Sequence, residues 1–384
     1  MRVLYLNPFS QEVSGPDESL RTLLRGLVPR GVEAHVALPA PGPQVPRYEA
    51  LGARIHIAPL APLRRDLSAA TALYPARLAR ATASVIGLAR AIRADLIHTN
   101  METLLEGSLA AATLRKPHVL HYRGNTLDQP KLVFDALVGV WTRGADAVYC
   151  ISEATAGVFR RRGHQWDKVE VLYNPVEVAT YAGAASSLEV RAALGGGPQQ
   201  LLVGTVGRIH PRKDLETFIR AAALVARARP DTRFAVVGAA EVEVEHAYEA
   251  RLRALIAELG LGDRVRLVGA RRDVPSVMKA FDIFTLTSRH EGFGRVVAEA
   301  MAAGRPVVVT DEGALPEVVG GGRDGLIAPA GDPSAFADRI LTLLAAPEEA
   351  AALGDRAAKA ARRFDTGAIA DRVFARYQAL VAKK

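Results

Sequence analysis

The sequence contains very little cysteine: Cys150 is the single cysteine among 384 residues. One cysteine excludes an internal disulfide framework, a zinc site built from cysteines and a dithiol redox pair. Long apolar runs are also missing, since the longest uncharged stretch, residues 192–207, is interrupted by Gly-Gly-Gly-Pro-Gln-Gln. A membrane-spanning helix needs about 20 continuous apolar residues, so the sequence excludes a transmembrane protein.

Several nucleotide and metal motifs are absent as well. No Gly-x-Gly-x-x-Gly follows the first apolar run, the glycines of VGTVGR have the wrong spacing, and no Walker A motif occurs. These absences argue against a dinucleotide dehydrogenase and a P-loop nucleotidase. The chain has no Asp-x-Asp pair and no ligand-spaced histidine pair, so we expect no required metal and no resident cofactor. The glutamates Glu241, Glu243 and Glu245 could hold a cation, but an exposed loop edge is the favoured interpretation.

The composition that remains is typical of a soluble globular protein. Hydrophobic residues make up 49% and charged residues 23%, which is too apolar for disorder and too charged for a membrane-embedded chain. The net charge of +8 favours an anionic partner, namely a phosphorylated small molecule, nucleic acid or an acidic lipid surface. The short apolar run before Asn7 is too brief for a signal-peptide core and predicts a buried strand, so a cytoplasmic location is expected.

Short aliphatic runs alternate with longer Ala-, Leu- and Arg-rich segments, which is typical of βα units around a parallel sheet. Each half of the chain contributes six such runs. The predicted strands are Arg2 to Asn7, Glu33 to Leu38, Leu96 to Thr99, His118 to Tyr122, Ala147 to Ile151, Val169 to Tyr173, Leu201 to Val206, Arg233 to Val237, Arg264 to Val268, Ile283 to Leu286, Val307 to Thr310 and Gly325 to Ala328.

Helices are predicted between these strands, and a composition break separates the two halves. The flexible, Gly/Ser/Pro-rich stretch at 184–200 reads as a linker between domains at 1–183 and 201–363. We therefore expect an α/β protein with two doubly wound, Rossmann-like domains and a ligand site beyond the carboxyl ends of the strands, in the cleft between the domains. The predicted helices are Asp17 to Val28, Ala76 to Ile92, Asp214 to Arg229, Tyr248 to Leu259, Gly294 to Ala303 and Pro333 to Ala345.

The segment from Ser288 to Glu317, SRHEGFGRVVAEAMAAGRPVVVTDEGALPE, carries the most chemical information. A Gly-Phe-Gly turn follows a buried strand and opens a helix, where free amides and the helix dipole favour a phosphate. Glu291 and Glu299 lie eight residues apart, a helical rise of roughly 12 Å. One carboxylate could face a sugar and the other the ribose of the same nucleotide, although an isolated pair of this kind is more often a helix-start and a solvated residue.

A second phosphate element follows the linker. Arg208 ends a buried strand, and Lys213 lies in a Pro-containing turn before the next predicted helix. Two cations there could offset the charge of a diphosphate and stabilise it as it leaves. The alternative is a pair of solvated basic residues with Asp214 and Glu216 as partners.

These motifs occur in the order found in one family. Glu291 to Glu299 match the E-x7-E motif of retaining nucleotide-sugar glycosyltransferases with the GT-B fold, and the chain resembles their family 4. SGPDESLRTLL resembles the Gly-Gly-x-Glu loop, with Pro16 for the second glycine. CISEAT and LYNPVE resemble a serine-containing strand end and an Asn-Gly-Val turn, with Pro175 for glycine. VGRIHPRKDLETFIRA resembles the Gly-Arg…Lys segment, and TDEGALPEVV the Gly-Gly-x-Pro-Glu turn, with Ala314 for glycine.

The resemblance implies a fold, an activity and roles for particular residues. It implies sugar transfer from a nucleoside diphosphate donor to a hydroxyl acceptor with retained anomeric configuration, without a protein nucleophile. It also implies that residues 364–384, with Phe374, Tyr377 and Leu380 at helical spacing, form a helix that crosses back to the first domain. The implied catalytic residues are His121, Arg208, Lys213 and Glu291; the implied donor-binding residues are Gly15, Arg208, Lys213, Arg271, Glu291, Phe293, Gly294 and Glu299; the implied acceptor-binding residues are Arg123 and Asn125.

His121 has two interpretations. It lies at a predicted strand end, where an imidazole could hydrogen-bond the transferred sugar, as the resemblance implies. A structural histidine is the alternative from the residues alone.

The stretch from Arg54 to Arg93 has seven arginines and one acidic residue, Asp66. It could lie on an anionic membrane, which would place the protein at the inner face, or it could be a sheet-covering helix with its arginines in solvent. Nucleic acid is disfavoured, because the arginines lack interleaved aromatic residues.

Two rival functions remain open. A sugar-nucleotide epimerase shares the architecture, and a non-catalytic sugar-nucleotide binder could use the same donor site. Transfer or hydrolysis of the donor by purified protein separates these hypotheses.

Overall fold

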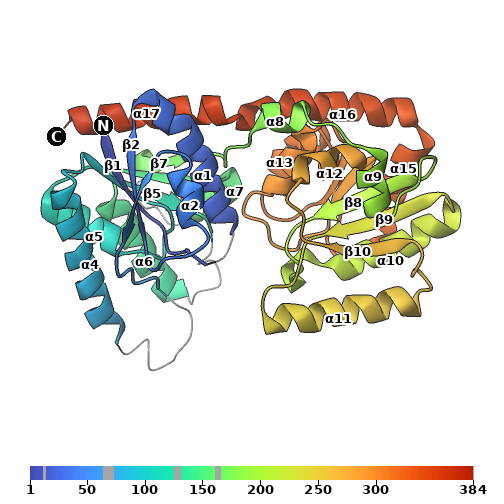
Figure 1. Cartoon of the computed structure of the whole chain (residues 1–384), viewed down its shortest axis with the longest axis horizontal. Helices are drawn as coiled ribbons and strands as arrows, with labels where there is room; N and C mark the ends of the chain where they lie inside the picture. Colours follow the sequence, from blue (N-terminus) through green and yellow to red (C-terminus); the bar gives the residue numbers. More distant parts are fainter. Residues whose placement is uncertain (12–13, 64–72, 125–130, 161–165, 384) are drawn as a thin grey trace. The chain divides into compact units, whose positions relative to one another are not determined.

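The computed structural model describes residues 1–11, 14–63, 73–124, 131–160 and 166–383. The chain forms two compact units (Figure 1). Unit 1 consists of Met1–Pro175 and Thr366–Lys384, and unit 2 of Val176–Asp365. Both units hold parallel sheets with helices on their faces, which agrees with the predicted α/β class.

Unit 1 is built on a seven-stranded parallel sheet in the order β3-β2-β1-β4-β5-β6-β7. The edge strand β3 was not predicted from the sequence; it is short and exposed, with Ile57 52% accessible, so it lacks the buried apolar run that marks the other strands. The strands are β1 (Arg2–Leu6), β2 (Glu33–Leu38), β3 (Arg54–Ile57), β4 (Leu96–Thr99), β5 (His118–Tyr122), β6 (Ala147–Cys150) and β7 (Val169–Val171).

The helices of unit 1 cover both faces of this sheet (Figure 1). α4 packs against α5 and buries Ala81, Val85 and Ala89, so its apolar stripe lies in the core and its arginines remain at the surface. The helices are α1 (Gly15–Leu27), α2 (Val45–Glu49), α4 (Tyr74–Ala91), α5 (Glu106–Leu114), α6 (Lys131–Gly144), α7 (Glu153–Arg160) and α17 (Thr366–Ala382), with the 3-10 turns η1 (Val28–Arg30) and η2 (Trp166–Lys168).

The C-terminal helix α17 belongs to unit 1, although residues 176–365 separate it from the rest of that unit. It lies along α1, where Gly26 permits the close approach: a Cβ at that position would stand 2.5 Å from the Cβ of Ala370. Its buried side chains are part of the same core cluster as the leucines of α1. Those buried side chains are Ile369, Ala370, Val373, Tyr377 and Leu380.

Unit 2 is built on a six-stranded parallel sheet in the order β10-β9-β8-β11-β12-β13. Its strands are β8 (Leu201–Val206), β9 (Thr232–Val237), β10 (Val265–Gly269), β11 (Ile283–Leu286), β12 (Val307–Thr310) and β13 (Leu326–Ala328). Its helices are α8 (Val178–Ala182), α9 (Leu188–Ala193), α10 (Leu215–Ala228), α11 (Glu243–Glu258), α12 (Val274–Ala280), α13 (Arg295–Ala302), α14 (Leu315–Val318), α15 (Pro333–Ala345) and α16 (Pro347–Ala361), with the 3-10 turns η3 (Pro211–Lys213), η4 (Gly320–Gly322) and η5 (Arg362–Phe364).

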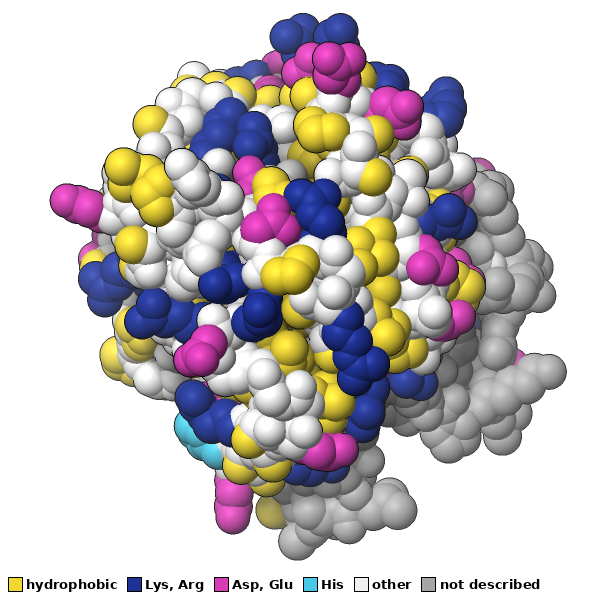
Figure 2. Space-filling view, turned by 90° about the vertical axis from the view of Figure 1, so that its right-hand side faces the viewer, with side chains coloured by type: hydrophobic (Ala, Val, Ile, Leu, Met, Phe, Trp, Pro, Cys, Tyr) yellow, Lys and Arg dark blue, Asp and Glu magenta, His cyan; other side chains and the backbone are white. Residues whose placement is uncertain are grey.

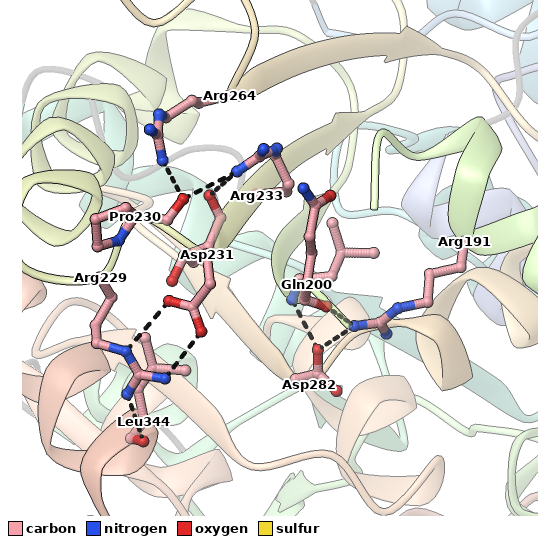
Figure 3. A network of polar contacts seen from close by, with 11 residues as sticks. Arg191, Gln200, Arg229, Pro230, Asp231, Arg233, Arg264, Asp282 and Leu344 are labelled. Carbon is pink, nitrogen blue, oxygen red and sulfur yellow. Dashed lines mark hydrogen bonds and ion pairs between the residues drawn. The ribbon is translucent and has the colours of Figure 1, made fainter. Parts of the chain in front are cut away.

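Polar contacts close the amino-terminal edge of the unit 2 sheet (Figure 3). Asp282, just before β11, accepts from Arg191 Nη2 at 2.6 Å and from the main-chain nitrogen of Leu202 at 2.7 Å. Arg229 makes two hydrogen bonds to Asp231, just before β9. Because Arg191 lies on α9, residues 188–193 of the predicted linker are a folded part of unit 2.

The surface of unit 2 has no concentrated basic region on the side drawn in Figure 2. Lys and Arg side chains there are spread among acidic and apolar ones. Within the described residues, no helix is both long enough and apolar enough to cross a membrane.

Candidate active site

The carboxyl ends of β8 and β11 bring two distant loops together in unit 2. Arg289 donates its main-chain N–H to the carbonyl of Arg212 at 3.0 Å, and the hydroxyl of Thr287 donates to the carbonyl of Lys213 at 2.9 Å. Asp214 adopts the left-handed conformation, with φ +46°, and its carboxylate accepts from Arg289 Nε at 2.8 Å. A non-glycine residue in that region is strained, so these contacts hold the turn in place.

Lys213 and Glu291 meet at this junction. Lys213 Nζ lies 2.7 Å from Glu291 Oε2, and the side chains are 22% and 19% accessible. Burial raises the pKa of Glu291, but the charge and hydrogen bond of Lys213 outweigh burial, so the pKa stays below its usual range. The structure thus brings together two predicted site residues as an ionised, partly exposed pair.

Arg208 is held by two glutamates, Glu241 in the loop after β9 and Glu245 in the first turn of α11. Its Nε lies 2.6 Å from Glu245 Oε1, and its Nη1 lies 3.1 Å from Glu241 Oε2. Glu245 is fully buried; burial raises its pKa, and the Glu241 amide together with Arg208 more than offsets that effect.

This arrangement corrects two sequence interpretations. The view of Glu241, Glu243 and Glu245 as an exposed loop edge is wrong for Glu245, which is buried because it faces Arg208. The alternative partners proposed for the cations are engaged elsewhere, since Asp214 pairs with Arg289 and Glu216 accepts from the hydroxyl of Tyr248.

Glu291 and Glu299 do not lie on one continuous helix. α13 begins at Arg295, after Gly294 with φ +83°, so Glu291 belongs to the preceding turn and the expected helical rise between the two carboxylates does not apply. Glu299 is 6% accessible and pairs with Arg295 at 2.8 Å. It is therefore not the solvated face residue of the alternative interpretation.

The turn of GALPE fixes the backbone of Glu291. Ala314 donates its N–H to the Glu291 carbonyl at 3.0 Å, and a Cβ on Gly313 would stand 2.2 Å from that carbonyl oxygen. Only glycine permits this approach, because Gly313 also has φ +59°. The last segment of the motif thus acts as a backbone support for the first glutamate.

Two other predicted donor-site residues of unit 2, Phe293 and Arg271, contact other parts of that unit. Phe293 is 2% accessible and packs edge-on against Phe364, with ring centroids 5.2 Å apart, so it belongs to the core. Arg271 follows β10 and makes two hydrogen bonds to Asp273, the shorter of 2.6 Å.

In unit 1, Gly15 opens α1 and is exposed, with no atom within 4 Å of the place where a Cβ would stand. Ser14 caps the helix, and Asp17 completes a capping box. The pKa of Asp17 is raised by burial, which outweighs its hydrogen bonds from Ser14 and Asn7.

His121 lies at the end of β5 and is 4% accessible. Its Nδ1 lies 2.7 Å from Nε2 of His98, at the end of β4. Burial, together with the positive charge of Arg123, holds the pKa of His121 well below its usual range, so the ring is neutral. Neutral imidazole fits the predicted hydrogen-bonding role.

Arg123 is buried and makes several hydrogen bonds within unit 1. Its guanidinium donates to the carbonyl and side-chain oxygens of Asn100 and to Oδ1 of Asn174, and its main-chain nitrogen donates to Glu102. These bonds fix the guanidinium beside the strand ends of unit 1. The other predicted acceptor residue, Asn125, lies outside the described residues.

Sequence reasoning missed the asparagines of this network. Asn100 Nδ2 donates to Asn7 Oδ1 at 3.2 Å, and the hydroxyl of Ser19 donates to Asn174 at 2.7 Å. A signal was present, since Asn7 and Asn100 each directly follow a buried strand. In the described part of the chain, no cluster of three or more His, Cys, Asp or Glu side chains could hold a metal ion.

Comparison with known proteins covers both units. Residues 13–180 match the family model described as Glycosyltransferase Family 4, and residues 188–360 match Glycosyl transferases group 1. The 2-deoxystreptamine glucosyltransferase of Streptomyces kanamyceticus is 30% identical over 346 residues, which cover 84% of this chain and 88% of that protein.

Two further relatives match this chain over different shares of its length. The lipopolysaccharide core biosynthesis mannosyltransferase LpsB of Rhizobium meliloti is 33% identical over 214 residues, 55% of this chain and 61% of that relative, so the chain spans about three fifths of its length. The crystal structure of HepE from Anabaena in complex with UDP-glucose is 26% identical with a TM-score of 0.83, and the match covers 99% of this chain and 100% of that one. The chain therefore belongs to the family 4 (group 1) glycosyltransferases and has their GT-B fold.

Proposed function

We propose that this protein transfers a hexose from a UDP-sugar to a hydroxyl acceptor with retention of anomeric configuration. The observation that carries the proposal is the cluster at the ligand edge of unit 2, where Arg208 and Lys213 lie in loops beside the helix that holds Glu299. HepE, which is similar over the whole chain, has been solved with UDP and with UDP-glucose. Uracil is thus the preferred base of the donor.

In this proposal the two cations bind the donor diphosphate. Each is partly exposed and paired with a partly exposed carboxylate, Arg208 with Glu241 and Lys213 with Glu291. A phosphate oxygen can take over one of these hydrogen bonds without leaving a buried charge unpaired. The amides at the start of α13, after Gly294, add positive potential for the same group. As negative charge develops on the leaving diphosphate, these fixed groups stabilise it.

The two glutamates bind the rest of the donor. Glu299 accepts from the ribose hydroxyls, in exchange for part of its contact with Arg295. Glu291 accepts from hydroxyls of the transferred sugar and orients Lys213 through their shared hydrogen bond. Phe293 supports the turn from inside the core and does not contact the donor.

The chemical step needs no protein nucleophile. The acceptor oxygen forms a bond to the anomeric carbon on the face from which the diphosphate leaves, and the bond from that carbon to the diphosphate oxygen breaks. The acceptor proton passes to the leaving oxygen. The protein contributes orientation of the reactants and charge stabilisation.

Unit 1 is proposed to bind the hydroxyl-bearing groups. Gly15 leaves room for a ligand at the start of α1, and His121 offers a neutral ring nitrogen to a sugar hydroxyl. Arg123 orients the strand ends around them through its bonds to Asn100 and Asn174. The similar proteins are named for lipopolysaccharide core biosynthesis and for 2-deoxystreptamine glycosylation, and both kinds of acceptor bear hydroxyl groups.

A thermal-shift and transfer experiment tests the proposal. UDP-glucose, GDP-mannose and ADP-glucose are added separately, and UDP-glucose is expected to stabilise the protein most. A ligand at 100 times its dissociation constant raises the free energy of unfolding by about 2.7 kcal/mol, which a melting curve detects. Released UDP and the anomeric configuration of the product are then followed by NMR. Stabilisation without release of UDP would favour a non-catalytic binder, and a free epimerised sugar would favour an epimerase.

A further inference from the structure

Three polar side chains of unit 1 are joined by buried hydrogen bonds in a row that ends at His121. The hydroxyl of Tyr377, on α17, hydrogen-bonds Nδ1 of His98, and Nε2 of His98 hydrogen-bonds Nδ1 of His121 at 2.7 Å. All three residues are buried, and Tyr377 and His98 have no accessible surface. His121 uses its Nδ1 for this bond, so its Nε2 takes no part in the hydrogen bonds between the three side chains.

Aromatic side chains surround these three hydrogen-bonded residues. The ring of Tyr5 lies 5.2 Å from that of His98, and the ring of Tyr149 lies 5.4 Å from that of His121. The two imidazoles also stack on one another, with centroids 4.9 Å apart. The hydrogen bonds are therefore shielded from water that could otherwise exchange their donors and acceptors.

Tyr377, His98 and His121 are all uncharged near neutral pH. Burial, with the nearby charge of Arg123, holds the pKa of His98 well below its usual range, as it does for His121. Burial, with the neighbouring Tyr5 and Tyr149 hydroxyls, holds the pKa of Tyr377 above its usual range. Each imidazole thus carries one N–H, and the phenol keeps its proton.

The phenol decides which nitrogens carry those protons. A phenol is a much stronger acid than a neutral imidazole, so its O–H donates to His98 Nδ1 rather than accepting from it. His98 must then carry its proton on Nε2 and donate to His121 Nδ1. Because that nitrogen accepts, the proton of His121 is on Nε2.

We propose that Tyr377 and His98 are positioning residues that hold His121 as the Nε2–H tautomer, so that His121 presents a hydrogen-bond donor to an oxygen atom of the bound substrate. The ligand class follows from this polarity: His121 selects an oxygen that accepts, such as a sugar hydroxyl with its own proton directed elsewhere. The proposal rests on the proposed function for the presence of a sugar, but the tautomer itself is a property of the ligand-free protein. It also assigns α17 a chemical role besides packing.

The tautomer is tested first, without substrate, by nitrogen-15 NMR of the histidine rings. In the full-length protein, His121 is expected to show a protonated Nε2 and an unprotonated Nδ1. Tyr377→Phe keeps the packed ring and removes the hydroxyl, and it should populate the Nδ1–H tautomer of His121. Tyr149→Phe is the matched control, because it removes a hydroxyl beside the same rings but neither of the two hydrogen bonds, and it should leave the spectrum unchanged.

A second pair of variants guards against a folding defect in Tyr377→Phe. His98→Gln keeps an N–H donor directed at His121 and should retain the Nε2–H tautomer, whereas His98→Leu should lose it. An Nδ1–H tautomer of His121 in the unaltered protein, or a tautomer that none of these changes affects, overturns the proposal.

Kinetics then connect the tautomer to turnover. Tyr377→Phe and His98→Leu should lower kcat/KM for the sugar donor by about 5- to 10-fold, the effect of one hydrogen bond, while His98→Gln should recover most of it. If no sugar transfer is found with any donor, the proposed function fails, while the NMR result still decides the tautomer. A shifted tautomer with undiminished kcat/KM would overturn the role in substrate binding.

Discussion

The ligand edges of the two units have the same origin, the carboxyl ends of parallel strands, but different chemistry. In unit 2 the edge carries ionised pairs, such as Lys213 with Glu291, whose side chains remain partly exposed. In unit 1 it carries a buried network in which the Arg123 guanidinium makes three hydrogen bonds and His121 is neutral. The first arrangement suits an anionic ligand, and the second suits uncharged hydroxyl groups.

The difference follows from the cost of exchanging partners. A partly exposed cation can replace a carboxylate by a phosphate oxygen, since water and salt already screen the pair. A buried guanidinium that makes three hydrogen bonds cannot move without leaving unsatisfied groups, at about 1 to 3 kcal/mol for each. Two parallel sheets of similar strand order can therefore suit different chemical groups at their ligand edges.

The largest expected effect is the loss of α17. A chain that ends at Asp365 removes four large apolar or aromatic side chains from the unit 1 core, each worth about 1.5 to 3 kcal/mol, which together approach the stability of a typical domain. Both tryptophans, at positions 141 and 166, lie in unit 1, so tryptophan fluorescence should report unfolding of that unit alone. Removal of Lys383 and Lys384 is the control.

Unit 2 should keep its fold in the same truncated chain, as measured by hydrogen exchange. Undiminished melting of unit 1 together with full activity would mean that α17 contributes little to either.

Removal of the unit 2 cations should have the next largest effect. Lys213→Ala and Arg208→Ala are each expected to lower kcat by about 10²- to 10³-fold, because the charge they stabilise develops in the transition state. Binding of free UDP should weaken less than turnover. Arg220→Ala, which alters an exposed cation on α10, is the control, and equal losses of binding and turnover would limit both residues to the ground state.

Acid should destabilise unit 1 before it affects the Lys213–Glu291 pair. His98 and His121 have pKa values well below 6.5 in the folded state, so below about pH 6.5 the unfolded chain binds protons that the folded chain does not. Stability should then fall by about 1.4 kcal/mol per pH unit for each ring. Urea unfolding followed by tryptophan fluorescence between pH 7 and 5 measures the slope.

The carboxylate of Glu291 in unit 2 responds in the same direction but at lower pH. The lowered pKa of Glu291 means that its contribution is present above its unfolded value of 4.5 and is lost only as pH falls through the lower folded value. His98→Gln should reduce the slope of unit 1 by about one histidine; an unchanged slope would show that His98 is protonated in the folded state.

Glu299→Ala should have a moderate effect on donor affinity. An ionised carboxylate that binds ribose hydroxyls is worth about 1.5 to 3 kcal/mol, which calorimetry with UDP would detect. Glu258→Ala alters a glutamate at the end of α11 and serves as the control. Unchanged affinity would remove Glu299 from the donor site and leave it as the partner of Arg295.

The smallest effect is expected at α4. Its apolar stripe is buried in unit 1, so contact with a membrane would depend on the arginines alone, at about 1 kcal/mol for each one near an anionic leaflet. Co-sedimentation with anionic vesicles should be weak, should fall with added salt and should fall again when Arg77 and Arg80, together with Arg64 and Arg65 outside the described residues, become Ser. Absence of binding at low salt would leave α4 as a sheet-covering helix.

Much of the architecture was determined by local sequence pattern. Buried aliphatic runs such as Leu201–Val206 and Ile283–Leu286 were predicted with the bounds that the structure has, because a strand covered on both faces leaves a continuous apolar signal. The position of Arg208 directly after such a run also indicated its place at the ligand edge. The exposed strand β3 leaves no comparable signal and was missed.

The partners of these residues were decided only by the tertiary structure. Lys213 meets Glu291 because β8 and β11 are neighbours in the sheet, and Arg208 meets Glu245 because α11 begins beside the end of β8. Tyr377 meets His98 because the last helix returns to unit 1. Sequence pattern reports whether a side chain faces a core or follows a strand, which is a local property. Which charge or ring lies opposite depends on strand order and helix packing, which join residues as distant in the sequence as His98 and Tyr377, 279 positions apart.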